Sequence, residues 1–211
     1  MSEKGKKMKR TLQLIIQIAF LALFILLFIS GRIQLWMGLF LLGIAASFLL
    51  GRIYCGWICS TNTVMVGVSW IKKKLHIKSL KIPTVFTKPW VRYLTLGLFI
   101  ITFIFSMVTG KRIPVLPALF AMGVLVTLLF PEELWHRYLC PYGNLMSLPA
   151  SQARHTMLIN EESCNNCGTC MRVCPAKAVE KSGNKHKINK AACLVCMKCS
   201  GNCSKNAISW K

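Results

Sequence analysis

The chain has 211 residues, 54% of them hydrophobic, and a mean hydropathy of +0.50. Its 27 Lys and Arg residues stand against six acidic residues, which gives a formal net charge of +21 at pH 7. Ordinary soluble domains are about 45–50% apolar with about 25% charged residues, so this composition excludes a plain cytosolic enzyme. Disordered chains need low hydrophobicity, and disulfide-rich secreted scaffolds are short, so neither class fits 11 cysteines beside long apolar runs. The composition indicates a membrane protein with metal or redox chemistry.

Four apolar blocks of the sequence are candidates for membrane-spanning helices. They are nearly free of charge and cover residues 11–29, 34–50, 90–108 and 115–130. A span needs about 20 mostly apolar residues, within a range of about 17–25, so the second block is at the short limit and the fourth needs flanking residues. Trp36, Trp90 and Trp135 lie at the ends of three blocks, where aromatic side chains anchor helices at the membrane surface. We therefore predict four transmembrane helices, in preference to the buried helices of a soluble core.

The connections and the basic residues predict how these helices are oriented. Residues 30–33 join the first two blocks and residues 109–114 join the last two, so each pair forms a tight hairpin. Five Lys and Arg residues precede the first block and seven lie in the 51–89 loop, whereas only Arg32, Lys111 and Arg112 lie on the opposite side. The positive-inside rule then places both termini in the cytoplasm, in a multi-pass protein of a prokaryotic plasma membrane. The first block is longer than the apolar part of a cleaved signal peptide, so we expect a retained helix.

The 51–89 loop contains a short amphipathic segment. Val64, Val68 and Ile71 have helical spacing, and three lysines at 72–74 follow them. This pattern is typical of a short helix on the anionic cytoplasmic face of the membrane. A solvated basic linker fits the same residues, and the sequence leaves both interpretations open.

The C-terminal region contains an internal repeat with a period of 29 residues. The first cysteine run recurs as a second one: Cys164, Cys167, Cys170 and Cys174, then Cys193, Cys196, Cys199 and Cys203. Each half predicts a strand, a cysteine-bearing loop, a short helical turn and a second strand, with a turn at residues 182–184 between the halves. A unit this short cannot bury a core alone, so we expect the halves to pack together around bound metal.

The spacing C-x2-C-x2-C-x3-C is the ligand run of bacterial ferredoxins, in which the fourth cysteine ligates the other cluster of a two-cluster protein. Three thiolates on one loop reach three irons of a cubane, and the fourth ligand comes from the other half of the repeat. One [4Fe-4S] cluster is thus assigned to Cys164, Cys167, Cys170 and Cys203. The other is assigned to Cys193, Cys196, Cys199 and Cys174. Structural zinc favours two separated Cys-x-x-Cys pairs, and a cytoplasmic location disfavours disulfides.

Two further pairs of ligand-type residues, called the membrane-edge residues below, follow the second and fourth apolar blocks. Cys55 and Cys59 form one pair, and His136 and Cys140 form the other, each with i, i+4 spacing. We expect this spacing to place each pair on one helical face, and the topology to place both pairs at the same membrane surface. Three thiolates and an imidazole could hold an additional iron–sulfur centre or a single metal such as zinc. The alternative is that small buried cysteines pack the helix ends.

Through these segments, nearly the whole chain resembles the NapH-type membrane polyferredoxins, a four-helix family with twin Cys-x3-Cys-Pro motifs. The resemblance rests on the span order, both membrane-edge motifs and the C-terminal double run. Two positions depart from the family pattern: His136 stands where the family has Cys, and Ser60 stands where it has Pro. The resemblance implies that electrons pass between the quinone pool or a cytoplasmic donor and a partner redox protein.

The residues also limit which cofactors and partners are expected. The four blocks contain no histidine, which excludes bis-histidine haem within them, and the chain has no C-x-x-C-H site. Gln13 and Gln17 lie one turn apart and could line a quinone pocket, although such a pair more often bonds a neighbouring helix. From residue 151 onward there are ten Lys and Arg residues and three Glu residues. This charge favours an acidic redox partner or anionic lipid headgroups over nucleic acid.

We therefore predict an α-helical membrane protein with a small α+β bacterial-type two-cluster ferredoxin domain at its C-terminus. Its parts are a basic cytoplasmic tail (1–10), a four-transmembrane-helix domain (11–150) and the ferredoxin domain (151–211). The expected function is single-electron transfer within an oxidoreductase system, and no catalytic residue is expected. Two alternatives stay open. One is reduction of a metal ion such as Cu(II) at the membrane-edge residues, and the other is redox sensing or assembly.

Overall fold

The computed structural model describes residues 3–109, 114–183 and 185–211, and it divides into two compact units. The first unit combines Met1–Ser60 with Met146–Lys211, and the second is Thr61–Leu145. Within the first unit, the N-terminal helices pack with the C-terminal cysteine repeat. The domain boundaries at residues 10 and 150 stay a prediction, because compact packing and independent domains are different properties.

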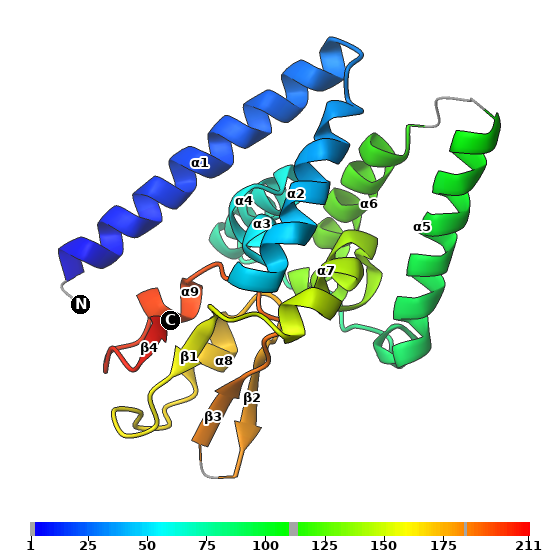
Figure 1. Cartoon of the computed structure of the whole chain (residues 1–211). Coiled ribbons are helices and arrows are strands. Elements are labelled where there is room, and N and C mark those ends of the chain that lie inside the picture. The colour runs from blue at the N-terminus through cyan, green and yellow to red at the C-terminus, as the bar shows by residue number, and fades with distance from the viewer. Residues whose placement is uncertain (1–2, 110–113, 184) are drawn as a thin grey trace. The chain divides into compact units, whose positions relative to one another are not determined.

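The helices of the first unit lie where the apolar blocks predict them. α1 (Glu3–Ile29) and α2 (Leu35–Leu50) form a hairpin, and the short α3 (Ile53–Trp57) follows (Figure 1). α1 begins inside the predicted basic tail, because Lys, Glu and Met are good helix formers even where a segment is charged. Gly43 allows Tyr54 to pack on α2, since a Cβ at this position would lie 2.8 Å from the Tyr54 ring.

The cysteine repeat folds as two small antiparallel sheets and two short helices (Figure 1). Its elements are β1 (Met157–Ile159), α8 (Thr169–Val173), β2 (Val179–Ser182), β3 (Lys185–Ile188), α9 (Lys198–Gly201) and β4 (Ile208–Trp210). β1 pairs with β4 and β2 pairs with β3, with Ile159 opposite Ile208 and Val179 opposite Ile188. The predicted order of strand, loop, helical turn and strand is therefore present in both halves. Of the predicted turn at 182–184, residue 184 lies outside the described residues.

The two halves of the repeat share one apolar core. Its buried side chains include Met157 and Val179 from the first half and Ile188, Val195 and Ile208 from the second. Each sheet pairs one strand of the first half with one strand of the second. Neither half can therefore bury these side chains alone. The prediction that the halves pack together is confirmed.

The second unit contains the helix of the 51–89 loop and the helices of the third and fourth apolar blocks. Its elements are α4 (Ser60–Lys74), η1 (Thr84–Thr87), α5 (Pro89–Thr109), α6 (Val115–Leu129), the π-helix η2 (Leu134–Leu139) and the start of α7 (Pro141–Ser151). α4 shows that, of the two interpretations left open for this segment, the helical one is present, and its location on a membrane surface stays a prediction. Lys72 ties α4 to α6 by donating from Nζ to the Thr127 carbonyl oxygen at 3.0 Å and to Ser79 Oγ at 2.8 Å. Burial lowers the pKa of Lys72.

All four predicted apolar helices are present, but they differ in length. Met8–Ile29 and Pro89–Ser106 are apolar over 22 and 18 residues and are long enough to cross a membrane, whereas α2 and α6 have 16 and 15 residues. Large apolar side chains on α1 and α5 are unburied, with Leu26 61% and Ile101 66% exposed. Lys111 and Arg112, two of the three basic residues predicted on the opposite side, lie outside the described residues.

Candidate functional site

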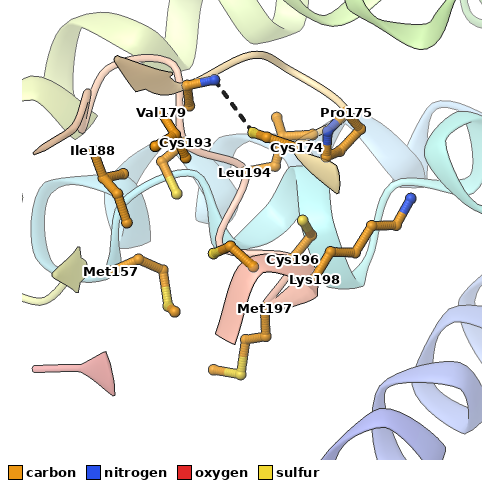
Figure 2. Close-up of a pocket in the computed structure, with 12 residues that line it drawn as sticks. Met157, Cys174, Pro175, Val179, Ile188, Cys193, Leu194, Cys196, Met197 and Lys198 are labelled. Atoms are coloured by element: carbon orange, nitrogen blue, oxygen red, sulfur yellow. Dashed lines mark hydrogen bonds between the residues drawn. The ribbon is translucent and has the colours of Figure 1, made fainter. Parts of the chain in front are cut away.

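Four cysteines from both halves of the repeat line one cavity in the first unit. These residues, called the inner set below, are Cys174, Cys193, Cys196 and Cys199. Figure 2 shows the sulfur atoms of Cys174, Cys193 and Cys196 around the same space, with Met157, Val179 and Ile188 on its apolar side. The backbone amide of Ala178 donates to Cys174 Sγ at 3.2 Å, which is the dashed bond in Figure 2.

The other four cysteines of the repeat line a second cavity. These residues, called the outer set below, are Cys164, Cys167, Cys170 and Cys203. Ile159, His186 and Ile208 contribute to its wall, and Lys205 lies at it as well. Cys167 is exposed, and its Sγ lies 3.5 Å from Thr169 Oγ1 in a hydrogen bond.

The eight thiols thus fall into the same two groups that the sequence assigns to two clusters. Each cavity is lined by three cysteines of one run and the fourth cysteine of the other run. Cys174 reaches the second run because it directly follows α8, and Cys203 reaches the first run because it follows α9, against which α8 packs. That each group binds a [4Fe-4S] cluster stays a prediction.

The two sets differ in how their surroundings affect the thiols. Burial raises the pKa of Cys193 to about 12 and also raises the pKa of Cys199, both in the inner set. In the outer set, burial raises the pKa of Cys170, whereas the hydrogen bond with Thr169 lowers the pKa of Cys167. Iron binds the thiolate form, so a metal that enters the inner set must displace protons from buried thiols.

The loop of the inner set is packed directly against α3. Trp57 Nε1 donates to the Val195 carbonyl oxygen at 3.1 Å, and Arg52 Nη1 donates to the Ala191 carbonyl oxygen at 3.3 Å. Gly56 makes the closest approach, because a Cβ at this position would overlap the Leu194 carbonyl oxygen. This contact is not among the features predicted from the sequence. The available signal was a glycine between two aromatic residues, next to Cys55.

Gln13 and Gln17 help to hold α3 in place. Their Nε2 atoms both donate to the Gly56 carbonyl oxygen, at 2.9 and 2.8 Å. The structure therefore contains the expected alternative, in which the two glutamines bond a neighbouring helix. These bonds connect the apolar helix α1 to the segment that contacts the inner set.

The helical-face prediction for the membrane-edge residues is wrong for both pairs. α3 ends at Trp57 and α4 begins at Ser60, so Cys59 lies in the break between them. His136 lies in the π-helix η2, which has a different periodicity from an α-helix, and Cys140 follows it with an extended backbone. An i, i+4 spacing places residues on one face only when an α-helix runs through both positions.

The surroundings of these cysteines are well packed. Cys55 is buried, with its Sγ 3.8 Å from Met146 Sδ and 3.9 Å from Arg52 Nη2. Cys140 is also buried and accepts a hydrogen bond from the Gly143 amide at 3.3 Å. Cys55 and Cys59 belong to the first compact unit, and His136 and Cys140 belong to the second. Within the described ranges, no three His, Cys, Asp or Glu side chains form a group that could hold a single metal ion. A four-ligand site stays a prediction.

Comparison with protein families identifies both halves of the chain with iron–sulfur proteins. A family described as "4Fe-4S binding domain" matches residues 33–78 and 112–154. A second family, described as "4Fe-4S dicluster domain", matches residues 156–204. The first match contains both membrane-edge motifs, and the second contains all eight cysteines of the repeat.

Curated relatives carry names from electron transport. The chain is 28% identical to the putative electron transport protein YccM of Escherichia coli, over 73% of this chain and 50% of the relative. It is 30% identical to the methylamine utilization ferredoxin-type protein MauN of Methylobacillus flagellatus, over 59% and 48%. It is 25% identical to the ferredoxin-type protein NapH of Haemophilus influenzae, over 75% and 62%.

The chain thus spans about half to three fifths of the length of these relatives. No solved structure matches it significantly. The relatives and both 4Fe-4S family matches agree with the cysteine runs and with the small α+β unit that carries them. The chain belongs to the NapH-type polyferredoxins, a family of ferredoxin-type iron–sulfur electron-transfer proteins.

Proposed function

We propose that the chain is a membrane-anchored electron-transfer protein whose C-terminal repeat holds two [4Fe-4S] clusters, one in the inner set and one in the outer set. The observation that carries this proposal is the grouping of eight thiols into two sets of four, each completed by the other half of the repeat. Bound there, a [4Fe-4S] cluster supplies reversible one-electron transfer.

The residues around each set suit such a group. Each cavity offers four thiol sulfurs, the ligand type of cubane clusters. The inner set has mostly apolar walls, including Met157 and Ile188, which exclude water. The Ala178 amide already donates a hydrogen bond to Cys174 Sγ, and hydrogen bonds to ligand sulfurs are a feature of iron–sulfur sites.

The two sets suit opposite ends of an electron relay. The outer set is accessible through the exposed Cys167, so a soluble redox protein can approach it. The inner set lies against α3, which α1 holds through Gln13 and Gln17. We assign the outer end to a partner redox protein, and the inner end to exchange with a quinol or with another centre near the membrane.

An acidic partner fits the charge of the repeat. Lys205 lies at the outer cavity, and Arg172 is held near it by a bond from Nη2 to Thr169 Oγ1 at 3.2 Å. Ten basic and three acidic residues after residue 150 give this region a positive field. Such a field speeds the encounter with a negatively charged redox protein and also favours anionic lipid headgroups.

We further propose that all four apolar helices cross the membrane. α1 and α5 have the required length, and the exposed apolar side chains of both helices suit a lipid environment. α2 and α6 are apolar throughout, but 15 or 16 residues span only about 23–24 Å at 1.5 Å per residue. Local thinning of the bilayer and the flanking residues make up the difference.

The orientation follows from the basic residues and is tested with reporter fusions. With both termini cytoplasmic, a green fluorescent protein at the C-terminus is expected to fluoresce, and alkaline phosphatase at the same position is expected to be inactive. Fusions in the loop at 109–114 are expected to give the reverse pattern. An active phosphatase at the C-terminus would contradict the orientation, and the same result at both positions would contradict a crossing between them.

We retain one more centre, iron–sulfur or another metal, at Cys55, Cys59, His136 and Cys140 as a proposal. Its support is the 4Fe-4S family match, which covers both motifs through residues 33–78 and 112–154. The close contact of α3 with the inner set would place such a centre near one end of the relay. The iron–sulfur form of this centre is tested by the iron count described in the Discussion, and another metal is tested by metal analysis of the same samples.

The proposed function is tested with the full chain in lipid nanodiscs prepared without oxygen. We expect a reduced acidic ferredoxin, or a menaquinol analogue, to bleach the visible absorbance of the iron–sulfur centres. The expected uptake by the repeat is about two electrons per chain, one for each cluster. The control variant combines Cys167→Ser and Cys196→Ser, removes one ligand from each set, and is expected to take up none there. Protein with complete iron that exchanges electrons with neither donor would contradict the relay.

A further inference from the structure

The repeat places different residues at one equivalent position beside the two cavities. Met157 and His186 are separated by 29 residues, the same offset that relates the cysteines. Met157 lines the cavity of the inner set, and His186 lines the cavity of the outer set. The neighbouring equivalent pair, Ile159 and Ile188, is alike in both halves. At this wall position the pseudo-symmetry is broken, because the inner cavity has a thioether where the outer cavity has an imidazole.

His186 is buried although it carries polar nitrogens. Its side chain is 6% exposed, because alternate residues of β3 point into the core. Its Nδ1 atom is fully buried and has no hydrogen-bond partner among the residues that the structure describes. A buried polar atom without a partner destabilises a protein, so such an atom usually has one in the functional state. At this position, the cavity of the outer set is the space that could supply it.

We propose that His186 is a positioning residue that donates a hydrogen bond from Nδ1 to the sulfur shell of the cluster in the outer set, and thereby raises the reduction potential of that cluster above that of the inner one. This inference rests on the proposed function. Thiolate and sulfide sulfurs are acceptors only, so they select the imidazole tautomer with the proton on Nδ1. Hydrogen bonds to cluster sulfurs stabilise the reduced, more negative state. The Met157 thioether at the inner set has no proton to donate.

The different solvent exposure of the two sets also raises the reduction potential of the outer cluster above that of the inner one. Cys167 of the outer set is exposed, whereas Cys199 of the inner set is buried. Solvent near a cluster also favours the form with more negative charge. The outer set, which faces the partner, is thus the more readily reduced end of the repeat, and His186 enlarges the difference.

The test compares midpoint potentials in anaerobically purified full chain by redox titration monitored with electron paramagnetic resonance. His186→Met copies the residue of the inner set and is expected to lower one potential only. The expected change is about tenfold in the one-electron reduction equilibrium, or about 59 mV. His186→Gln retains a donor and is expected to restore most of the difference. Met157→His is the reciprocal variant, and is expected to raise the other potential.

Three results would overturn the inference while leaving the proposed function in place. They are unchanged potentials in His186→Met, equal shifts of both centres, and a His186→Gln variant that behaves like His186→Met. Iron and sulfide are measured on the same samples. A full complement of both with unchanged potentials contradicts the role of His186, whereas wild-type protein without iron contradicts the proposed function itself.

Discussion

Replacing Cys203 with serine is expected to remove the cluster of the first cysteine run, although Cys203 belongs to the second run. Cys203 lines the outer cavity together with Cys164, Cys167 and Cys170, and a serine hydroxyl is a poor ligand for iron. We expect a loss of about four irons per chain and of one of the two paramagnetic signals. Iron and sulfide analysis with paramagnetic resonance measures both. Thermal stability is expected to fall as well, because metal binding contributes to the folding of so small a unit.

The controls for Cys203→Ser test which ligands share a cluster. Cys164→Ser is expected to remove the same signal, whereas Cys174→Ser and Cys193→Ser are expected to remove the other one. Ser204→Ala, at the next position along the chain, is expected to retain both signals. If Cys203→Ser gave the same spectrum as Cys193→Ser, each run would bind its own cluster, and the interleaved assignment would be wrong.

Replacing Gly56 with alanine is expected to displace the loop of the inner set from α3. The added Cβ would overlap the Leu194 carbonyl oxygen and would lie 3.2 Å from the backbone of Cys196. Backbone atoms cannot move aside as a flexible side chain can, so we expect destabilisation at or above the usual 1–3 kcal/mol for overpacking, about 3 kcal/mol. The expected result is a lower melting temperature and partial loss of the inner cluster, measured by unfolding and by paramagnetic resonance.

Gly67→Ala is the matched control for this variant. Gly67 lies in α4 with an ordinary helical backbone, and a Cβ there meets nothing within 4 Å. Alanine is the better helix former by about 1 kcal/mol, so this variant is expected to be neutral or slightly more stable. If Gly56→Ala behaved like Gly67→Ala, with both clusters retained, the close packing of α3 on the inner loop would be contradicted.

The features that follow from apolar composition and from the spacing of the cysteines could be predicted from the sequence. The apolar blocks predicted α1, α2, α5 and α6 within a few residues at most ends, because removal of apolar side chains from water follows composition. The ferredoxin spacing of the two cysteine runs, in which the fourth cysteine joins the other run, predicted which thiols lie together.

Features that depend on breaks in regular structure could not be predicted in this way. The i, i+4 spacing places residues on one face only where an α-helix runs through both. Instead, the segment Cys55–Cys59 contains the gap between α3 and α4, and the segment His136–Cys140 lies mostly in the π-helix η2. Neither single-residue propensities nor a fixed helical period shows where a helix ends early or widens into a π-helix. The contact of Gly56 with the inner loop was missed for a related reason, because it joins residues nearly 140 positions apart.

The central claim, two interleaved cubanes in the C-terminal repeat, is tested most directly by counting iron and acid-labile sulfide in anaerobically purified full chain. The measurement is made in the variant with Cys55→Ala and Cys140→Ala, so that only the repeat contributes, and is repeated in the wild type. The account predicts about eight irons and about eight sulfides per chain in the variant. About twelve irons per chain in the wild type would show that the membrane-edge residues bind a further four-iron centre. A colourless, iron-free variant, or one with only about four irons, would contradict the claim.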